Sequence, residues 1–170
     1  MVIGLKRGTV KIVPYQVECE GLFEQERRLL ARCIGNLVVD IQHVGSTAVP
    51  GLEAKPIIDI AIAVADPKMI SRCTRPLAAI GYIDRGDSGK NGGYLFVKES
   101  APGVRTYHLH LVTVEDSQWR TYLRYRDLLR GDETIRARYA NLKARLKRLY
   151  PDDRGRYTSG KHDFIRSVLQ

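Results

Sequence analysis

Hydrophobic and polar positions follow two different periods along the first half of the chain. Residues 9–14 and 38–44 have the pattern of short strands, and residues 57–64 form a nearly continuous apolar run that predicts a central strand of a sheet. Between the first two strands, apolar residues recur at helical spacing and predict a helix that begins at Glu18. The apolar positions of that helix are Phe23, Leu30, Cys33, Ile34 and Leu37.

A second helix is predicted from the residues at its two ends. Asp66 supplies an N-cap, Pro67 suits the first helical position, and Gly81 ends the helix. After it, residues 82–84 and 94–98 flank the turn-rich sequence SGKNGG, which predicts a β-hairpin.

The rest of the chain is predicted to be mainly helical. Residues 106–114 alternate and predict a last strand. Three helices follow, over residues 116–130, 132–150 and 159–169. Gly131 and Pro151 separate them, and no internal repeat or linker divides the chain. We therefore expect one domain over residues 1–170, of the α/β (α+β) class, with a mixed sheet and a helical C-terminal layer.

Composition supports a globular protein. Of the 170 residues, 44% are hydrophobic and 28% are charged, which is too apolar for a disordered chain and sufficient for one core. No apolar run approaches the roughly 18 residues that a membrane span requires, and the sequence MVIGLKRGTVKIVPY lacks the apolar region of a signal peptide. We expect a cytoplasmic protein with no membrane partner.

The net charge of +9, from 28 Lys and Arg against 19 Asp and Glu, favours anionic partners. Nucleotides, phosphorylated metabolites and nucleic acid all qualify. Many of the basic residues lie on the predicted C-terminal helices, where a solvated basic face is an equally good explanation. Nucleic acid is the least favoured partner, because the sequence has neither an aromatic stacking motif nor a recognition helix.

The segment HVGSTAVPGLEAKPIIDI joins two predicted strands through a turn that is suited to bind an anion. Gly45 lets the backbone approach a ligand, Ser46 and Thr47 offer hydroxyl and amide groups, and Lys55 adds a mobile positive charge. A plain connecting loop is the alternative, because small residues and proline are common in loops. The strand that follows favours the binding turn.

Side chains alternate along that strand, so Asp59 shares a face with Ile57, Ala61 and Ala63. A carboxylate in a central strand must be paired, hydrogen-bonded or bound to a metal. A structural ion pair with Lys55 or an arginine is the alternative to a functional role. The position of Asp59 just after the anion-binding turn favours function, as a metal ligand or a base.

The sequence TYHLHLVTV places His108 and His110 on one face of a predicted strand. Two imidazoles about 6–7 Å apart can share a metal or a phosphate, or one can act as a general base. Histidine is a poor ligand for Mg²⁺, so a transition metal would suit a site that these residues form with Asp59. A chance pair of histidines on a strand is the equally weighted alternative.

The helix predicted over WRTYLRYRDLLRG carries a second candidate anion site. Arg126 and Arg130 lie along its apolar stripe at i, i+4, where they can form a clamp for phosphate or carboxylate, and Asp127 can orient one of them. Three further candidates that could face a site are Lys143, beside the apolar stripe of the next helix, and Tyr157 and Lys161 in RYTSGKHDFI.

A Gly-Ser turn followed, after twelve residues, by a strand aspartate resembles the arrangement of the nucleotidyltransferase superfamily typified by DNA polymerase β. In that superfamily the turn holds a triphosphate, and strand carboxylates hold two magnesium ions for in-line phosphoryl transfer. The superfamily pattern has a second carboxylate two residues after the first, where this chain has Ala61. A late strand supplies the third carboxylate, and here that strand carries His108 and His110.

These motifs together resemble the GrpB family, also called UPF0157, in the segments KIVPY, HVGSTAVPGLEAKPIIDI, HLHLV, YRDLLR, YANLK and RYTSGKHDFI. The resemblance implies a polymerase-β-like nucleotidyltransferase fold and a nucleotide or other phosphorylated ligand, with Mg²⁺ or Mn²⁺ as the expected metal unless the histidines ligate. Some relatives are fused to dephospho-coenzyme A kinase, which points to coenzyme A or nucleotide metabolism. The family pattern carries over onto His43, Gly45, Ser46, Thr47, Lys55, Asp59, His108, His110, Arg126, Asp127, Arg130, Lys143, Tyr157 and Lys161.

Two functions are consistent with these motifs and with the resemblance. The first is metal-dependent nucleotidyl transfer, in which Asp59 and His110 bind the metal and Asp59, His108 and His110 are catalytic. The second is a non-catalytic module that binds a nucleotide or phosphorylated metabolite and regulates a partner, and Ala61 favours it. In both, the ligand-binding residues are His43, Gly45, Ser46, Thr47, Lys55, Arg126, Arg130, Lys143, Tyr157 and Lys161.

Overall fold

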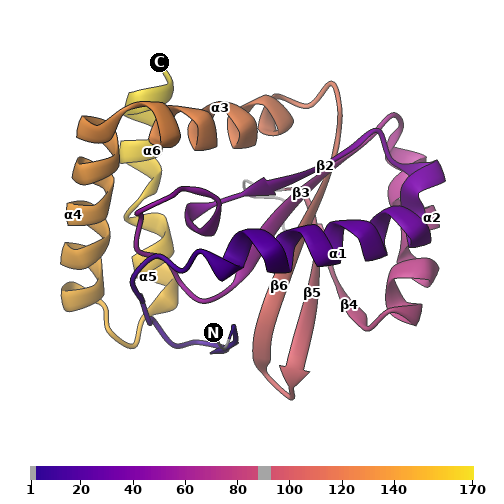
Figure 1. The fold of residues 1–170 in the computed structure, drawn as a ribbon, viewed down its shortest axis with the longest axis horizontal. Coiled ribbons are helices and arrows are strands. Elements are labelled where there is room, and N and C mark those ends of the chain that lie inside the picture. The colour runs from indigo at the N-terminus through magenta and orange to yellow at the C-terminus, as the bar shows by residue number, and fades with distance from the viewer. Residues whose placement is uncertain (1–2, 88–92) are drawn as a thin grey trace.

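The computed structural model describes residues 3–87 and 93–170. It consists of a mixed sheet with helices on both faces (Figure 1). The strands are β1 (Leu5–Lys6), β2 (Asp40–Val44), β3 (Ile58–Val64), β4 (Tyr82–Asp87), β5 (Tyr94–Ala101) and β6 (Val104–Thr113). The helices are α1 (Glu18–Ile34), α2 (Pro67–Ala79), α3 (Ser117–Gly131), α4 (Glu133–Leu149), α5 (Arg154–Ser159) and α6 (His162–Leu169), with short 3₁₀ turns η1 (Gly35–Leu37) and η2 (Ser46–Ala48).

The sheet has the strand order β2-β3-β6-β5-β4, and β1 adds a further pairing to β6. Strands β3 and β6 run parallel, and their register places Asp59 beside His108. The other pairs are antiparallel. The prediction that residues 57–64 form a central strand is therefore confirmed, and the mixed sheet is confirmed as well.

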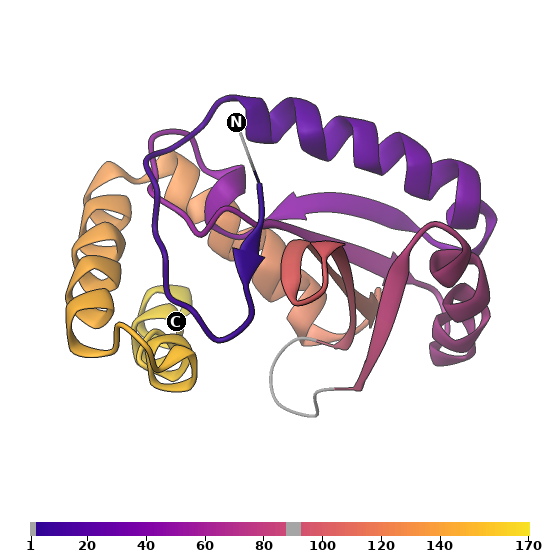
Figure 2. The ribbon, with the colours of Figure 1, turned by 90° about the horizontal axis from the view of Figure 1, so that it is seen from below.

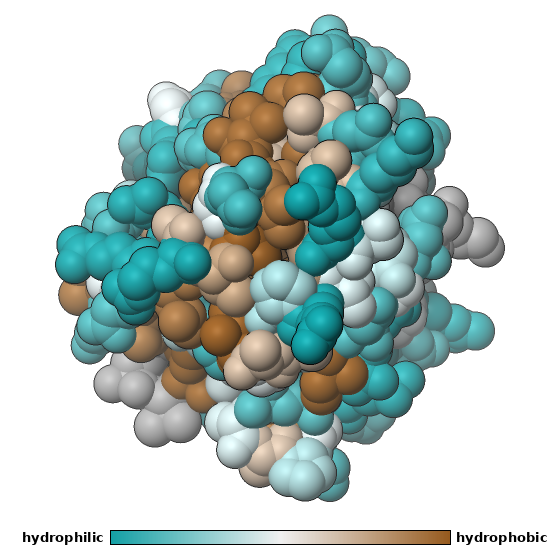
Figure 3. All heavy atoms as spheres, turned by 90° about the vertical axis from the view of Figure 1, so that its right-hand side faces the viewer, coloured by the Kyte–Doolittle hydropathy of each residue, from teal (hydrophilic) through white to brown (hydrophobic). Residues whose placement is uncertain are grey.

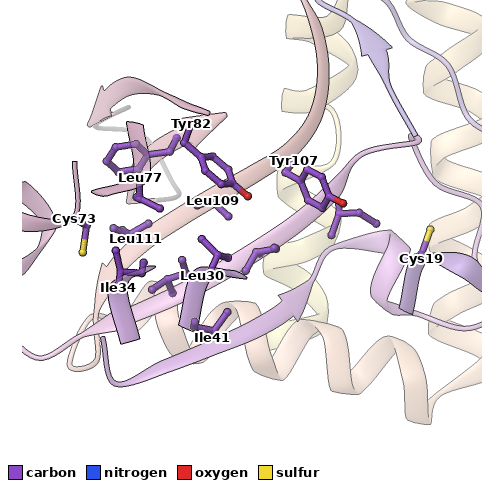
Figure 4. Close-up of a cluster of buried hydrophobic side chains, with 14 residues drawn as sticks. Cys19, Leu30, Ile34, Ile41, Cys73, Leu77, Tyr82, Tyr107, Leu109 and Leu111 are labelled. Carbon is purple, nitrogen blue, oxygen red and sulfur yellow. The ribbon is translucent and has the colours of Figure 1, made fainter. Parts of the chain in front are cut away.

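Helices α1 and α2 cover one face of the sheet and enclose the larger part of the core. Ile58, Ile60 and Ile62 of β3 point into this layer and are fully buried. Leu30 and Ile34 of α1 belong to the same cluster and lie close to Leu109 and Leu111 of β6 (Figure 4). The predicted α1 stripe and the alternation along β3 are both confirmed.

Helix α3 packs on the opposite face of the sheet. Trp119 of α3 lies against Ala61 and Ala63 of β3, together with Val44 and Val112. The two alanines have short side chains, so the helix can approach the strand closely. Asp59, His108 and His110 point to this same side of the sheet.

Helices α4, α5 and α6 gather at one end of the molecule, beside the connection from β2 to β3 (Figures 1 and 2). Tyr139 of α4 packs there against Val49, Leu52 and Leu129. The helical C-terminal layer is confirmed, and it closes the end of the sheet instead of covering a face.

The opposite end of the molecule, at α2, carries an apolar stripe between hydrophilic side chains (Figure 3). Within residues 3–87 and 93–170, no helix has the length and apolar character that crossing a membrane requires.

The first predicted strand, residues 9–14, is wrong. In this segment only Val13 makes a bridge, exchanging backbone hydrogen bonds of 2.9 and 3.0 Å with Ala54. The first strand of the sheet is β1, which lies earlier in the chain. Pro14 has no N–H to continue the pairing. The segment therefore fastens the β2–β3 connection instead of joining the sheet.

The helix predicted over residues 159–169 is α6, which begins at His162, and a short helix that was not predicted, α5, precedes it. Asp153 caps α5 by accepting a hydrogen bond from the backbone N–H of Arg156, so helix begins earlier than predicted. Gly160 lies between the two helices.

The hairpin between β4 and β5 is confirmed, while residues 88–92 of its predicted turn lie outside the described residues.

Candidate functional site

A cavity of about 110 Å³ lies between the β2–β3 connection and the C-terminal helices. It is lined by Gly45, Ser46, Thr47, Ala54, Lys55, Ile57, Asp59, Tyr139, Lys143, Tyr157 and Lys161. All of these except Ala54, Ile57 and Tyr139 are site residues that the sequence predicted. The tertiary structure thus brings together residues that are more than a hundred positions apart in the chain, such as Gly45 and Lys161.

Three lysines from separate elements meet at this cavity: Lys55 before β3, Lys143 on α4, and Lys161 at the start of α6. Lys143 is only 3% exposed, and its Nζ donates hydrogen bonds to the Ser46 hydroxyl (3.3 Å) and to the backbone carbonyl of Glu53. Lys161 lies over the ring of Tyr157, with Nζ 4.8 Å from the ring centroid. The cavity therefore concentrates positive charge.

Burial changes the acid–base behaviour of these lysines. It lowers the pKa of Lys143 to about 7 and that of Lys161 to about 7, and the positive charge of Lys55 adds to both effects. Burial also lowers the pKa of Lys55, although the carboxylate of Asp59 opposes that change. An anion in the cavity would reverse these shifts, because it would stabilise the charged ammonium groups.

Asp59 is the only acidic residue among the described residues that line the cavity. Its Oδ1 accepts a hydrogen bond from His108 Nδ1 at 3.0 Å and lies 3.7 Å from His110 Nε2. Burial alone would raise the pKa of Asp59, but the two histidines outweigh burial and hold that pKa well below its usual range. Burial lowers the pKa of His108. At neutral pH the pair is thus a carboxylate and a neutral imidazole.

Gly45 brings the Gly-Ser turn against this carboxylate. Its φ is +71°, and a Cβ at this position would lie 2.8 Å from Asp59 Oδ2. A side chain here would clash with the carboxylate in a backbone conformation that already favours glycine. The close approach that glycine permits is therefore first of all to Asp59, whereas the sequence pattern predicted an approach to a ligand.

Behind the turn, His43 acts as a support. Its ring stacks on Phe23 of α1 with the centroids 4.7 Å apart, and its Nε2 lies 3.1 Å from Thr47 Oγ1. Thr47 Oγ1 in turn donates to the carbonyl of Ile57 (3.4 Å). Burial lowers the pKa of His43 to about 4, so the ring is neutral. Because the Thr47 hydroxyl hydrogen points to Ile57, Nε2–H of His43 donates to Thr47 Oγ1. His43 is not among the lining residues.

The two arginines of α3 also hold the turn from outside the cavity. Arg126 donates through Nη1 to the carbonyl of His43 (3.1 Å) and to Gln42 Oε1 (2.8 Å), while Asp127 accepts from its Nε at 2.7 Å. Arg130 donates through Nε to the carbonyl of Ala48 (2.8 Å). The predicted orientation by Asp127 is present, but the guanidinium groups are on backbone carbonyls and not at the cavity.

Asp59, His108 and His110 are the only group of three or more His, Cys, Asp or Glu in residues 3–87 and 93–170 whose ligand atoms are close enough to hold a metal ion, within 4.8 Å of one another. Two imidazoles and one carboxylate suit a transition metal, whereas Mg²⁺ prefers oxygen ligands. Ala61 is fully buried under α3, so the strand offers neither a second carboxylate nor space for one. The residues therefore fit one transition-metal ion and do not fit a pair of magnesium ions.

The surroundings of His108 make it a poor ligand for such a metal. Its Nε2 is buried without a hydrogen-bond partner among the described residues. A metal-bound histidine normally donates its second N–H to a carboxylate, a carbonyl or a water. His110, which is 20% exposed and lies beside Tyr122, is thus the better-placed histidine ligand next to Asp59.

Tyr139 is a lining residue for which the sequence predicted only a place in the apolar stripe of α4. It does pack in the core, with ring centroids 5.5 Å from both Tyr125 and Phe164, yet it also reaches the cavity. A tyrosine on such a stripe is a usable signal, because a buried Tyr hydroxyl usually needs a polar neighbour.

Comparison with known proteins identifies the relatives of this chain. The family model described as "GrpB protein" matches residues 9–170. The chain is 33% identical to "Glutamate-rich protein GrpB" of Alkalihalophilus pseudofirmus, over 98% of both chains. It is 32% identical to "UPF0157 protein YqkA" of Bacillus subtilis, over 94% of this chain and 46% of that protein.

A solved structure supports the same relationship. The crystal structure of the conserved protein GrpB from Enterococcus faecalis superposes with a TM-score of 0.79 and 27% identity, over 94% of this chain and all of that chain. Since the family model spans nearly the whole chain and the Alkalihalophilus protein matches from end to end, this chain belongs to the GrpB family.

Proposed function

We propose that this protein binds the phosphate group of a small phosphorylated molecule, of the nucleotide class, in the cavity beside Asp59. The observation that carries the proposal is the meeting of Lys55, Lys143 and Lys161 around one carboxylate. Asp59 supplies one negative charge against three lysines, so it does not neutralise them by itself.

Electrostatics favours an anion in this position. Like charges that share a partly buried site repel one another more strongly than they would in water. A phosphate dianion offsets this repulsion and accepts hydrogen bonds from the ammonium groups and from the Ser46 hydroxyl. The nearby η2 turn adds small residues whose backbone can approach the ligand.

The size of the cavity limits which part of the ligand it encloses. At about 110 Å³ it is smaller than the roughly 300–1,000 Å³ of pockets that enclose a drug-sized molecule. The cavity fits a phosphoryl group, and the remainder of the ligand lies outside it.

Isothermal titration calorimetry with orthophosphate, AMP, ATP, coenzyme A and dephospho-coenzyme A tests the proposal. The two coenzymes are included because a relative, 28% identical over 83% of this chain, is named "Dephospho-CoA kinase" in Mycobacterium leprae, where the match spans 42% of that protein. We expect binding by the wild type and at least about tenfold weaker binding by Lys143→Met. Lys147→Met, an exposed residue of the same helix, is the matched control. Failure of the wild type to bind any of these compounds would refute the proposal.

A second function, nucleotidyl transfer dependent on a single metal ion, is favoured by the Asp59–His108–His110 group. Asp59 and His110 would hold the ion, and a bound metal would supply charge stabilisation for phosphoryl transfer. The test is release of pyrophosphate from ATP, with water as the acceptor of the adenylyl group, in the presence of Mg²⁺, Mn²⁺ or Zn²⁺. We expect release by the wild type and not by Asp59→Asn. Metal-independent ligand binding that survives Asp59→Asn, with no pyrophosphate release, would instead favour the non-catalytic binding module.

A further inference from the structure

A second group of basic residues lies next to the cavity and has no part in the site described above. Arg105 is near the start of β6, where it pairs with Leu5 of β1. Arg7 follows β1, and its backbone N–H donates to the carbonyl of Gly103 at 2.8 Å. Arg154 is the first residue of α5.

The guanidinium group of Arg105 is buried, and no carboxylate pairs with it closely. It is 9% exposed, and its Nε is buried with no hydrogen-bond partner among the residues that the structure describes. Its acidic neighbour is Glu99, whose Oε1 is 3.9 Å from Arg105 Nε and 3.5 Å from Arg85 Nη2. The other oxygen of Glu99 accepts from the backbone N–H of Gly103 at 2.8 Å. Arg85 and Arg105 thus share the single carboxylate of Glu99.

A local irregularity of the sheet accounts for this position. Lys98 pairs with Tyr107 whereas Glu99 pairs with Arg105, so β6 has one extra residue, Thr106, at a bulge. The bulge breaks the alternation that would otherwise give Arg105 the same direction as Tyr107, which belongs to the core. Bulges commonly re-aim a side chain beside a functional site.

The backbone places this group beside the cavity. Gly4, just before β1, donates its N–H to the carbonyl of Pro56 at 2.8 Å, next to Lys55. Arg154 lies three residues before the lining residue Tyr157, on the same face of α5.

Besides burial, the charges of Arg154 and Arg105 lower the pKa of Lys55, and the charges of Arg154, Arg85 and Arg7 lower the pKa of Arg105. Lys161 is affected by Arg154 in the same way. Lys55 therefore connects the three-lysine cavity with the arginines. A buried charge that is not closely paired is costly, and a bound anion removes that cost.

We infer that Arg7, Arg105 and Arg154 form a second anion subsite beside the cavity, so that the ligand is an oligophosphate with at least two phosphoryl groups in series. The inference rests on the proposed function, because the first phosphoryl group occupies the lysine cavity. The second phosphoryl group lies past Lys55, toward β1 and the start of α5. A molecule with only one phosphate would leave the arginines unneutralised.

Calorimetric titration with orthophosphate and with tripolyphosphate, without metal, tests the subsite. We expect the wild type to bind tripolyphosphate at least about tenfold more tightly than orthophosphate. Arg154→Gln and Arg105→Gln should lose that preference and still bind orthophosphate. Arg148→Gln, which removes an exposed arginine from the last turn of α4, is the matched control and should keep the preference.

The outcomes separate this inference from the proposed function. If the wild type binds both anions equally, or if Arg154→Gln keeps the wild-type preference, the second subsite is refuted while phosphate binding in the cavity stands. If the wild type binds neither anion, the second subsite is refuted, and the proposed function is decided by the titrations with AMP, ATP and the two coenzymes. A thermal melt verifies that each variant is folded. If Arg105→Gln does not fold, the titration of Arg154→Gln, at a half-buried position, tests the subsite.

Discussion

The backbone of Gly45 lies directly against the carboxylate of Asp59, and a Cβ at position 45 would approach Oδ2 to 2.8 Å and the Asp59 Cβ to 3.1 Å. The turn and the strand therefore depend on each other: glycine permits the contact, and the contact places Ser46 and Asp59 at one cavity. His108 completes the arrangement from the neighbouring parallel strand.

Gly45→Ala is expected to destabilise the fold and abolish phosphate binding. The new methyl group meets Asp59 in a backbone conformation with φ +71°, at a combined cost of about 2–4 kcal/mol in the free energy of unfolding. Gly51→Ala is the control, because Gly51 has a similar φ of +76° but no described atom within 4 Å of an added Cβ. It should cost about 1 kcal/mol. If Gly45→Ala and Gly51→Ala lowered the free energy of unfolding in urea equally, the contact with Asp59 would contribute nothing to stability.

Arg126→Gln is expected to lower stability more than it lowers affinity. The variant loses charged hydrogen bonds to the carbonyl of His43 and to Gln42, worth about 1.5–3 kcal/mol in the free energy of unfolding. Arg124→Gln, an exposed position on the same helix, should change stability by less than about 0.5 kcal/mol. If Arg126 binds the ligand directly, affinity would fall while the urea midpoint stayed unchanged, which is the opposite result.

Stability is expected to fall as the pH is lowered from about 6.5 to about 4, because of His43. Burial depresses the pKa of His43 to about 4 in the folded protein, against about 6.5 in the unfolded chain. In this window the unfolded chain binds a proton that the folded protein does not, so unfolding is favoured by up to about 3 kcal/mol at the acid end.

His43→Gln isolates this contribution. The amide can still donate to Thr47 but does not titrate, so the decline in urea stability between pH 6.5 and pH 4 should become shallower. His162→Gln removes an exposed histidine of α6 and serves as the control. An unchanged pH profile in His43→Gln would contradict the prediction.

Phosphate binding is expected to take up protons above neutral pH. Burial lowers the pKa values of Lys143 and Lys161 to about 7, so at pH 8 both are largely neutral in the free protein, and a bound dianion raises their pKa values again. Affinity should therefore decrease as the pH rises from 7 to 9.

Calorimetry at pH 8 in two buffers with different ionisation enthalpies measures this proton uptake. Lys143→Met should reduce the uptake, and Lys147→Met should not. Uptake that is absent in the wild type would mean that the two lysines remain charged in the free protein.

Much of the site was determined by the sequence. The strict alternation over residues 57–64 places Asp59 on the alanine face whatever the strand packs against, because the side-chain period of a strand is two. The same rule puts His108 and His110 on one face. The motif from His43 to Asp59 also carries the Gly-Ser turn and Lys55 into the neighbourhood of that carboxylate, because a short connection limits how far they can lie from it.

Only the tertiary structure decided which distant basic residues reach the cavity. Lys143, Tyr157 and Lys161 reach it because α4 packs on Val49 and Leu52 of the β2–β3 connection and the chain then returns through α5. Arg126 and Arg130 do not reach it, because the packing of α3 brings them to the carbonyls of His43 and Ala48 instead. Helical periodicity tells which side chains share a stripe, but the partner of that stripe depends on long-range packing, which no local pattern contains.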